Sequence, residues 1–189
     1  MLNKNILVPM ANGTEESEAV IVIDLLRRTE ANVIISGLSK EVITSHNIVI
    51  KTSVLLDDIN SNTIFDAIIL PGGLKGVEAF CNNKHLIELL KNNYIAKSII
   101  GAICAAPIVL EKANILTNND TFTCHPSVIN KINLKNHISA KTVWNNNKQI
   151  ITSQGLGTAF EFSFEIIKKL YNYNIANTIA SNIVYYNSI

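Results

Sequence analysis

The sequence has few cysteines, and none of them belongs to a recognisable pair. Cys81, Cys104 and Cys124 are odd in number and far apart, and the 189 residues contain no C-x-x-C and no paired Cys/His pattern. These spacings argue against a disulfide framework and against a zinc site. We therefore expect reduced thiols, a cytoplasmic location and no bound metal.

Charge of either sign is also scarce. Charged residues make up 16% of the chain and the formal net charge is +1, which is not the footprint of a nucleic-acid-binding protein. No apolar run is long enough to span a membrane, and the first residues do not form a signal-peptide pattern. We expect neither a nucleic acid nor a membrane as a partner.

Glycine-rich phosphate loops are missing as well. The first strand-like run is not followed by G-x-G-x-x-G, and Gly155-x-Gly157 is too short to count as a phosphate loop. This argues against a dinucleotide-dependent enzyme. We expect no bound cofactor.

What the chain does contain is enough apolar sequence for a full core. Hydrophobic residues make up 48% of the chain, and no polar linker, repeat or low-complexity tract divides it. We expect one domain over residues 1–189. Strand-like runs alternate with helical ones, which predicts an α/β fold whose mostly parallel sheet is covered on both faces. The expected strands are 5–10, 32–37, 42–44, 48–50, 66–70, 98–103, 121–124, 142–144 and 149–152. The expected helices are one that opens at 14–17 and runs on through 19–28, and those at 76–80, 85–93, 105–113, 159–170 and 175–185.

The stretch from Ser98 to Leu110 places a cysteine between a strand and a helix. An apolar run leads up to Cys104, and a helical pattern with Pro107 in its first turn follows it. Such a bend pushes the residue at its tip out of the packed layer, and the helix N-terminus behind it favours thiolate over thiol. Cys104 is thus a candidate nucleophile, and the alternative is a buried structural cysteine.

Glu18 is the candidate acid beside it. It lies in the first turn of the first helix, before an apolar run, and Thr14 is a candidate cap for that helix. Partial burial would raise the pKa of Glu18, so that it could hydrogen-bond a thiolate or shuttle a proton. The alternative, a solvated acid favoured by the helix dipole, suits Glu15 and Glu16 better.

Two glycines and a histidine complete the candidate site. Gly72-Gly73 follows a core strand, and its N–H groups, together with that of Ala105, could form an oxyanion hole. His125 could orient or deprotonate a substrate hydroxyl, or it could be an ordinary turn residue.

The remaining histidines and cysteines have ordinary interpretations. We expect His85 and His137 to be solvated, and His46 to matter only if its hairpin reaches a neighbouring subunit. Cys81 and Cys124 are expected to be packing thiols.

The first helix is apolar around most of its circumference between Ala19 and Arg28. One buried face needs less apolar surface than this. We therefore expect the helix to form a subunit interface.

Taken together, these stretches resemble the ThiJ/PfpI superfamily, and within it the branch of the Parkinson-disease protein and its bacterial YajL-type relatives. The matching stretches, which run through the chain in the family's order, are GTEESEAV at 13–20, IDLLRR at 23–28, LPGGLKG at 70–76, AICAAP at 102–107 and TSQGLGTAFEF at 152–162. The resemblance implies a flavodoxin-like three-layer sandwich and a homodimer formed through the first helix. It also implies that Cys104 is the nucleophile, Glu18 the adjacent acid, and Gly73 and Ala105 the backbone donors, with His125 at the family's histidine position.

The sequence departs from other branches at identifiable positions. Ala105 stands where the protease branch has a histidine after the nucleophile, and the late His-x-Glu of glutaminases is missing. Leu156 stands where many members of the resembled branch have proline.

The resemblance implies a cysteine-dependent deglycase or glyoxalase acting on glyoxal-derived adducts or free methylglyoxal, in protection against carbonyl and oxidative stress. The alternatives are a redox-sensing chaperone with an oxidisable Cys104, or a protein of the thiamine-biosynthesis group that gave ThiJ its label.

Overall fold

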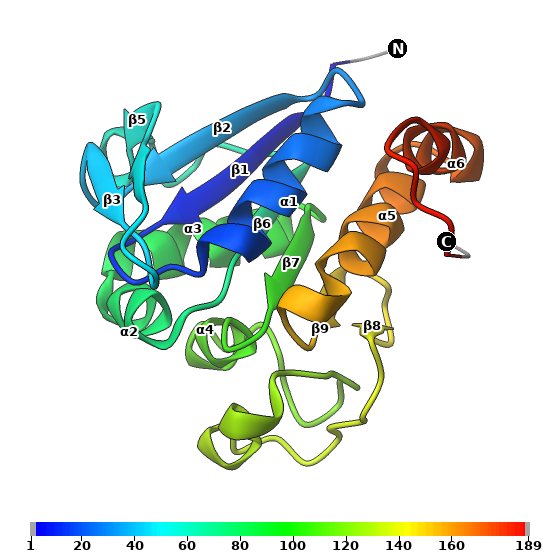
Figure 1. The fold of residues 1–189 in the computed structure, drawn as a ribbon. Coiled ribbons are helices and arrows are strands. Elements are labelled where there is room, and N and C mark those ends of the chain that lie inside the picture. Colours follow the sequence, from blue (N-terminus) through cyan, green and yellow to red (C-terminus); the bar gives the residue numbers. More distant parts are fainter. Residues whose placement is uncertain (1–2, 188–189) are drawn as a thin grey trace.

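The computed structural model describes residues 3–187, and its centre is a seven-stranded sheet with strand order β5-β2-β1-β6-β7-β9-β8 (Figure 1). All neighbouring strands in it run parallel except β8 and β9, which form the expected antiparallel hairpin. The strands are β1 (Asn5–Met10), β2 (Asn32–Gly37), β5 (Val54–Leu55), β6 (Ala67–Leu70), β7 (Ile99–Ile103), β8 (Thr142–Trp144) and β9 (Ile150–Ser153). The prediction of an α/β fold with a mostly parallel sheet is confirmed.

Helices cover both faces of the sheet, which gives three layers (Figure 1). One face packs against α2, α3 and α4 and the other against α1, α5 and α6. Along β1, Ile6, Val8 and Met10 point to the second face and Leu7 to the first, which is why this strand is an unbroken apolar run. The helices are α1 (Glu16–Arg27), α2 (Leu74–Asn82), α3 (Lys84–Ile95), α4 (Pro107–Lys112), α5 (Ala159–Leu170) and α6 (Tyr173–Asn182).

Smaller elements lie outside the sheet. β3 (Glu41–Ile43) and β4 (Val49–Lys51) form the expected antiparallel hairpin. Short 3₁₀ helices are found at η1 (Leu56–Asp58), η2 (Pro126–Lys131) and η3 (Leu156–Thr158). The strand expected at 121–124 is reduced to a single bridge between Phe122 and His137, so that prediction was wrong.

The start of α1 also differs from the prediction. The helix begins at Glu16, and Glu15 in the cap position makes no side-chain capping bond. Thr14 does not cap the helix; its Oγ1 accepts a hydrogen bond from the Ala11 N–H and closes the turn after β1.

The carboxyl ends of the central strands meet at one edge of the sheet. The register pairs Leu70 of β6 with Ala102 of β7, and Ile103 of β7 with Ser153 of β9. The segments that follow β1, β6, β7 and β9 therefore converge there, as expected for a parallel sheet. None of the helices over the described residues 3–187 has the length and hydropathy needed to cross a bilayer.

Candidate active site

Cys104 lies at the tip of a strained bend between β7 and α4. Its φ is +64°, a left-handed conformation that costs a non-glycine residue about 1–3 kcal/mol. The surrounding backbone holds it in place: the Cys104 N–H donates to the Ser153 carbonyl at 2.9 Å, and the Cys104 carbonyl accepts from the His125 N–H at 2.9 Å. The predicted elbow is confirmed, and the Cys104 side chain remains partly exposed.

Glu18 projects from the first turn of α1 to the sulfur of Cys104. Its side chain is 1% exposed, Oε2 accepts from the Gly72 N–H at 2.9 Å, and the carboxyl group hydrogen-bonds the Cys104 side chain. The solvated alternative is therefore wrong for Glu18.

Gly72 makes this approach possible because it has no side chain. A Cβ at Gly72 would lie 2.5 Å from Cys104 Cβ and 2.7 Å from Glu18 Oε2. The prediction that the Gly72 N–H is an oxyanion donor was wrong, because in the structure this N–H donates to Glu18 Oε2.

Burial sets the electrostatics of the Glu18–Cys104 pair. It raises the pKa of Glu18 to about 7, against the opposing hydrogen bonds from Gly72 and Cys104. Burial and then the charge of Glu18 raise the pKa of the Cys104 thiol to about 12. The helix N-terminus behind the sulfur acts in the opposite direction and favours the thiolate, so the expectation of a thiolate stays a prediction. The carboxyl group and the sulfur are in hydrogen-bond contact, so Glu18 is placed to exchange a proton with Cys104.

Backbone donors from two loops converge on the same sulfur. The N–H groups of Gly73 and Ala105 hydrogen-bond Cys104 and act to lower its pKa. Gly73 has φ +91°, and a Cβ there would collide with the Gly13 carbonyl and lie 2.6 Å from the Glu15 nitrogen. This position therefore requires glycine. The structure thus brings together four predicted site residues: Cys104, Glu18, Gly73 and Ala105.

His125 lies at the edge of this group. Gly155 lies between His125 and Glu18. A Cβ placed on Gly155 would be 3.4 Å from Cδ2 of the His125 ring and 3.7 Å from Glu18 Oε1. No hydrogen bond joins the His125 ring to the sulfur among the described contacts. The ring is exposed beside the site, where it can reach a substrate.

The other two cysteines have different surroundings. Cys124 is fully buried in the core on the α2–α3–α4 side of the sheet, and burial raises its pKa to about 11. Cys81 is partly buried on α2, and burial raises its pKa as well. Both are packing thiols, as expected.

Two of the remaining histidines correct the sequence analysis. His85 is half-buried, with Nε2 2.7 Å from the Ile59 carbonyl. His137 is half-buried against Phe122, and its Nε2 lies among the buried side-chain atoms without a hydrogen-bond partner. The expectation that both are solvated was wrong.

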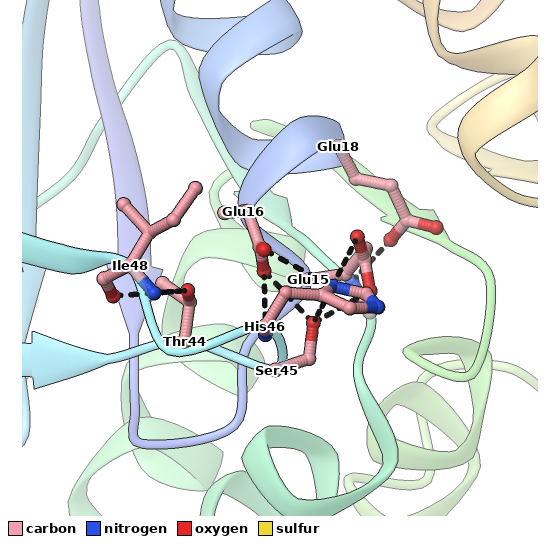
Figure 2. Close-up of polar contacts among 8 residues, drawn as sticks. Glu15, Glu16, Glu18, Thr44, Ser45, His46 and Ile48 are labelled. Carbon is pink, nitrogen blue, oxygen red and sulfur yellow. Dashed lines mark hydrogen bonds and ion pairs between the residues drawn. The ribbon is translucent and has the colours of Figure 1, made fainter.

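Glu15 and Glu16 join α1 to the β3–β4 hairpin (Figure 2). Ser45 Oγ donates to Glu15 at 2.7 Å or to Glu16 at 2.8 Å, and His46 Nδ1 lies 3.0 Å from Glu16. Glu16 is 5% exposed, so it is not the solvated acid expected from the sequence. Burial acts to raise its pKa, but hydrogen bonds from its own backbone and from the hairpin outweigh this and lower the pKa to about 2.

The same cluster has the geometry of metal ligands. Among residues 3–187, one trio of such side chains, Glu15, Glu16 and His46, has donor atoms within 4.8 Å of one another. Ser45 and the N-terminus of α1 already satisfy these carboxylates, so we assign the cluster a structural role.

One contact at the site was missed in the sequence: the bond from Ser127 to the His125 ring. The pattern His-Pro-Ser contains a signal for it, because a side-chain acceptor followed by proline often caps a helical turn.

Three comparisons place the chain among known proteins. A model of the DJ-1/PfpI family matches residues 4–169. Protein DJ-1 homolog B of Arabidopsis thaliana is 39% identical over 88% of this chain, which spans only 38% of that relative. The glutathione-independent glyoxalase DJR-1.2 of Caenorhabditis elegans is 34% identical over 87% of each chain. The solved structure of oxidized Toxoplasma gondii DJ-1 superposes with a TM-score of 0.91 at 30% identity, covering 97% of this chain and all of that one.

Proposed function

This chain belongs to the DJ-1/PfpI family, and on that basis we propose that it is a cysteine-dependent enzyme acting on glyoxal-type carbonyl compounds, as a glyoxalase or a deglycase. The relative from Caenorhabditis elegans is named a glyoxalase. The observation that carries the proposal is the contact between Glu18, with its pKa raised by burial to about 7, and the sulfur of Cys104. We place the reaction in the cytoplasm, where the three thiols would stay reduced.

The first step in this proposal forms a bond between the sulfur and the substrate. As Cys104 Sγ adds to the aldehyde carbon of methylglyoxal, its proton passes to Glu18 and the carbonyl electrons move to oxygen. The N–H groups of Gly73 and Ala105, which point at the sulfur, are placed to hold that oxyanion. Glu18 then returns the proton to the oxygen and becomes a carboxylate again.

The second step moves the carbonyl along the substrate. Glu18 removes the proton from the former aldehyde carbon, and the electrons of that C–H bond form the carbon–carbon double bond of an enediol whose second oxygen takes up a proton. Return of a proton to the neighbouring carbon, with loss of the proton from the hydroxyl on the sulfur-bearing carbon, leaves a lactoyl thioester on Cys104. Water then cleaves the thioester, which releases lactate and restores the thiol. The sum is methylglyoxal plus water to lactate, so no external oxidant or reductant is needed.

The test is lactate formation from methylglyoxal by the purified chain. Cys104→Ala should abolish it, because Cys104 is the thiol that Glu18 contacts. Cys81→Ser is the matched control and should keep wild-type activity. Equal lactate formation by wild type and Cys104→Ala would contradict the proposal.

A kinetic experiment distinguishes free aldehyde from glycated adducts as the substrate. Methylglyoxal adducts of thiols dissociate spontaneously, so a glyoxalase clears them no faster than they dissociate. A deglycase clears them faster. Comparing the clearance rate with the dissociation rate decides between the two activities.

A second candidate function is redox sensing, with or without a chaperone role. Cys104 is the partly exposed thiol at the site, and Glu18 and two N–H groups surround its sulfur, where they would hydrogen-bond the oxygens of a sulfinate. Limited peroxide should then add two oxygens to Cys104 first, as read by peptide mass spectrometry. Earlier oxidation of Cys81 or Cys124 would contradict this function.

A further inference from the structure

The loop that carries His125 fixes the hydrogen-bonding character of its ring. His125 precedes the 3₁₀ turn η2, and its side chain caps that turn. The Ser127 N–H lies 3.2 Å from Nδ1, and Ser127 Oγ lies 2.8 Å from the same nitrogen.

A backbone N–H can only donate, so the nitrogen that it meets must offer a lone pair. Nδ1 therefore accepts, and the proton of the neutral ring lies on Nε2. The Ser127 hydroxyl, 2.8 Å away, can donate to Nδ1 when this nitrogen carries the lone pair. A proton on Nδ1 would face the N–H and break the cap.

The opposite edge of the ring faces the active site. Cδ2, the carbon bonded to Nε2, lies 3.4 Å from the position of a Cβ on Gly155, and Glu18 Oε1 lies 3.7 Å from that position. The backbone N–H of His125 also donates to the Cys104 carbonyl at 2.9 Å, which ties the loop to the elbow. The edge that carries the Nε2 proton is thus held beside the nucleophile and the acid.

We propose that Ser127 is a positioning residue that holds His125 in the tautomer with its proton on Nε2, so that His125 donates a hydrogen bond to a substrate oxygen and is not the base. The donor role rests on the proposed function, whereas the tautomer is a property of the free protein. Glu18 is then the base of the site, and the two residues have separate tasks.

Nuclear magnetic resonance tests the tautomer without any substrate. In long-range proton–nitrogen spectra, Nε2 couples to both carbon-bound ring protons, which identifies it. We expect Nε2 of His125 to be the protonated nitrogen and Nδ1 to be the acceptor, and Ser127→Ala to shift the Nδ1 resonance. A proton on Nδ1 would overturn the proposal even if the protein is an active glyoxalase.

Two substitutions of His125 separate the cap from the donor. Asparagine can place an acceptor where Nδ1 lies, and glutamine can place an N–H donor near Nε2. His125→Asn should keep the melting temperature and lose at least tenfold in kcat/KM. His125→Gln should lower the melting temperature and keep more of the activity. The reverse pattern would overturn the donor role.

A double-mutant cycle tests whether Ser127 acts through His125. In the wild-type background, Ser127→Ala should lower kcat/KM roughly fivefold, which is the effect of losing one neutral hydrogen bond. In the His125→Asn background, the same substitution should leave kcat/KM unchanged. Ser181→Ala, which removes another exposed hydroxyl that bonds a backbone carbonyl, is the matched control and should change nothing. An equal loss in both backgrounds would show a merely structural role and overturn the proposal.

If wild type has no carbonyl turnover at all, the proposed function fails, and the tautomer measurement still decides the role of Ser127.

Discussion

At the scale of single residues, the site depends on the contact between the Glu18 carboxyl group and the Cys104 thiol. Burial raises the pKa of both groups, to about 7 for Glu18 and to about 12 for Cys104. Because the two groups are in contact, a proton that leaves the sulfur has an acceptor beside it.

Glu18→Gln should change how the stability of the protein depends on pH. The pKa of Glu18 is higher in the folded state, about 7, than its ordinary value of 4.5. Its stabilising contribution is therefore fully present below pH 4.5 and is lost as the pH rises through 7. Between those limits the free energy of unfolding of wild type should fall, relative to Glu18→Gln, by about 3 kcal/mol. Denaturant unfolding of both proteins across this pH range measures the difference, and parallel curves would contradict the raised pKa.

Gly72→Ala should disturb the site through its backbone. The added Cβ would lie within 2.7 Å of both Cys104 and Glu18, so the pair must separate, at a cost of about 1–3 kcal/mol in stability and with most of the turnover lost. Gly157→Ala is the matched control, because a Cβ there meets nothing within 4 Å. Thermal melting and lactate formation check both variants. A Gly72→Ala protein that behaves like Gly157→Ala would show that the close packing is unimportant.

The residues of the site could be predicted from the sequence, but the burial that shifts their pKa values could not. Cys104 follows a strand and precedes Pro107, and Glu18 follows a turn, so both positions can be recognised in the pattern. The pKa of the sulfur depends on how deeply α1 and the Gly72 loop bury it. Burial of this kind arises from contacts between segments 54 and 86 residues apart in the chain, and a local pattern does not contain them.

At the scale of elements, α1 serves the site at one end and exposes an apolar residue in its middle. Ala19, Val22, Ile23, Leu25 and Leu26 are buried within the chain, whereas Val20 is 51% exposed. Most of the apolar side chains that suggested an interface are therefore buried in the core of the same chain. Val20 and the partly exposed Ile21 are the apolar side chains of α1 that are still available to a second subunit. The interface itself stays a prediction.

Val20→Glu should convert a homodimer into a monomer without unfolding it, because the side chain is already half exposed and the helix tolerates glutamate. Ile95→Glu is the matched control, since Ile95 is 74% exposed on α3, on the other face of the sheet. Light scattering should show a dimer for wild type and Ile95→Glu and a monomer for Val20→Glu. A Val20→Glu protein that is still dimeric would contradict an interface through α1.

Element boundaries were predictable where periodicity is long and uninterrupted. Helix α5 was predicted at 159–170 and is found there, because its apolar positions repeat through three turns. The start of α1 was misplaced because Thr14 resembles a cap, whereas its hydroxyl closes the preceding turn. The strand expected at 121–124 is lost because its apolar residues, Phe122 and Cys124, pack into the core without a paired strand on either side.

At the scale of the whole molecule, the parallel sheet gathers loops from distant parts of the sequence at one edge. Cys104, Glu18, Gly73 and Ala105 meet there because β1, β6 and β7 are neighbours in the sheet. We propose that residues 1–189 act as one domain and that its carbonyl chemistry takes place at this edge. Strand order was not predictable from the sequence, since the pattern of elements is the same for several orders.

The pH dependence of kcat/KM for lactate formation from methylglyoxal tests most directly whether Glu18 is the base that activates Cys104. This quantity reports the ionisation of groups in the free enzyme. It should rise through a single midpoint near pH 7, the pKa of Glu18, and Glu18→Gln should lose roughly 10²-fold or more together with the midpoint. A rate that climbs only above pH 8.5, as for an ordinary free thiol, or a Glu18→Gln variant with the wild-type profile, would contradict the account.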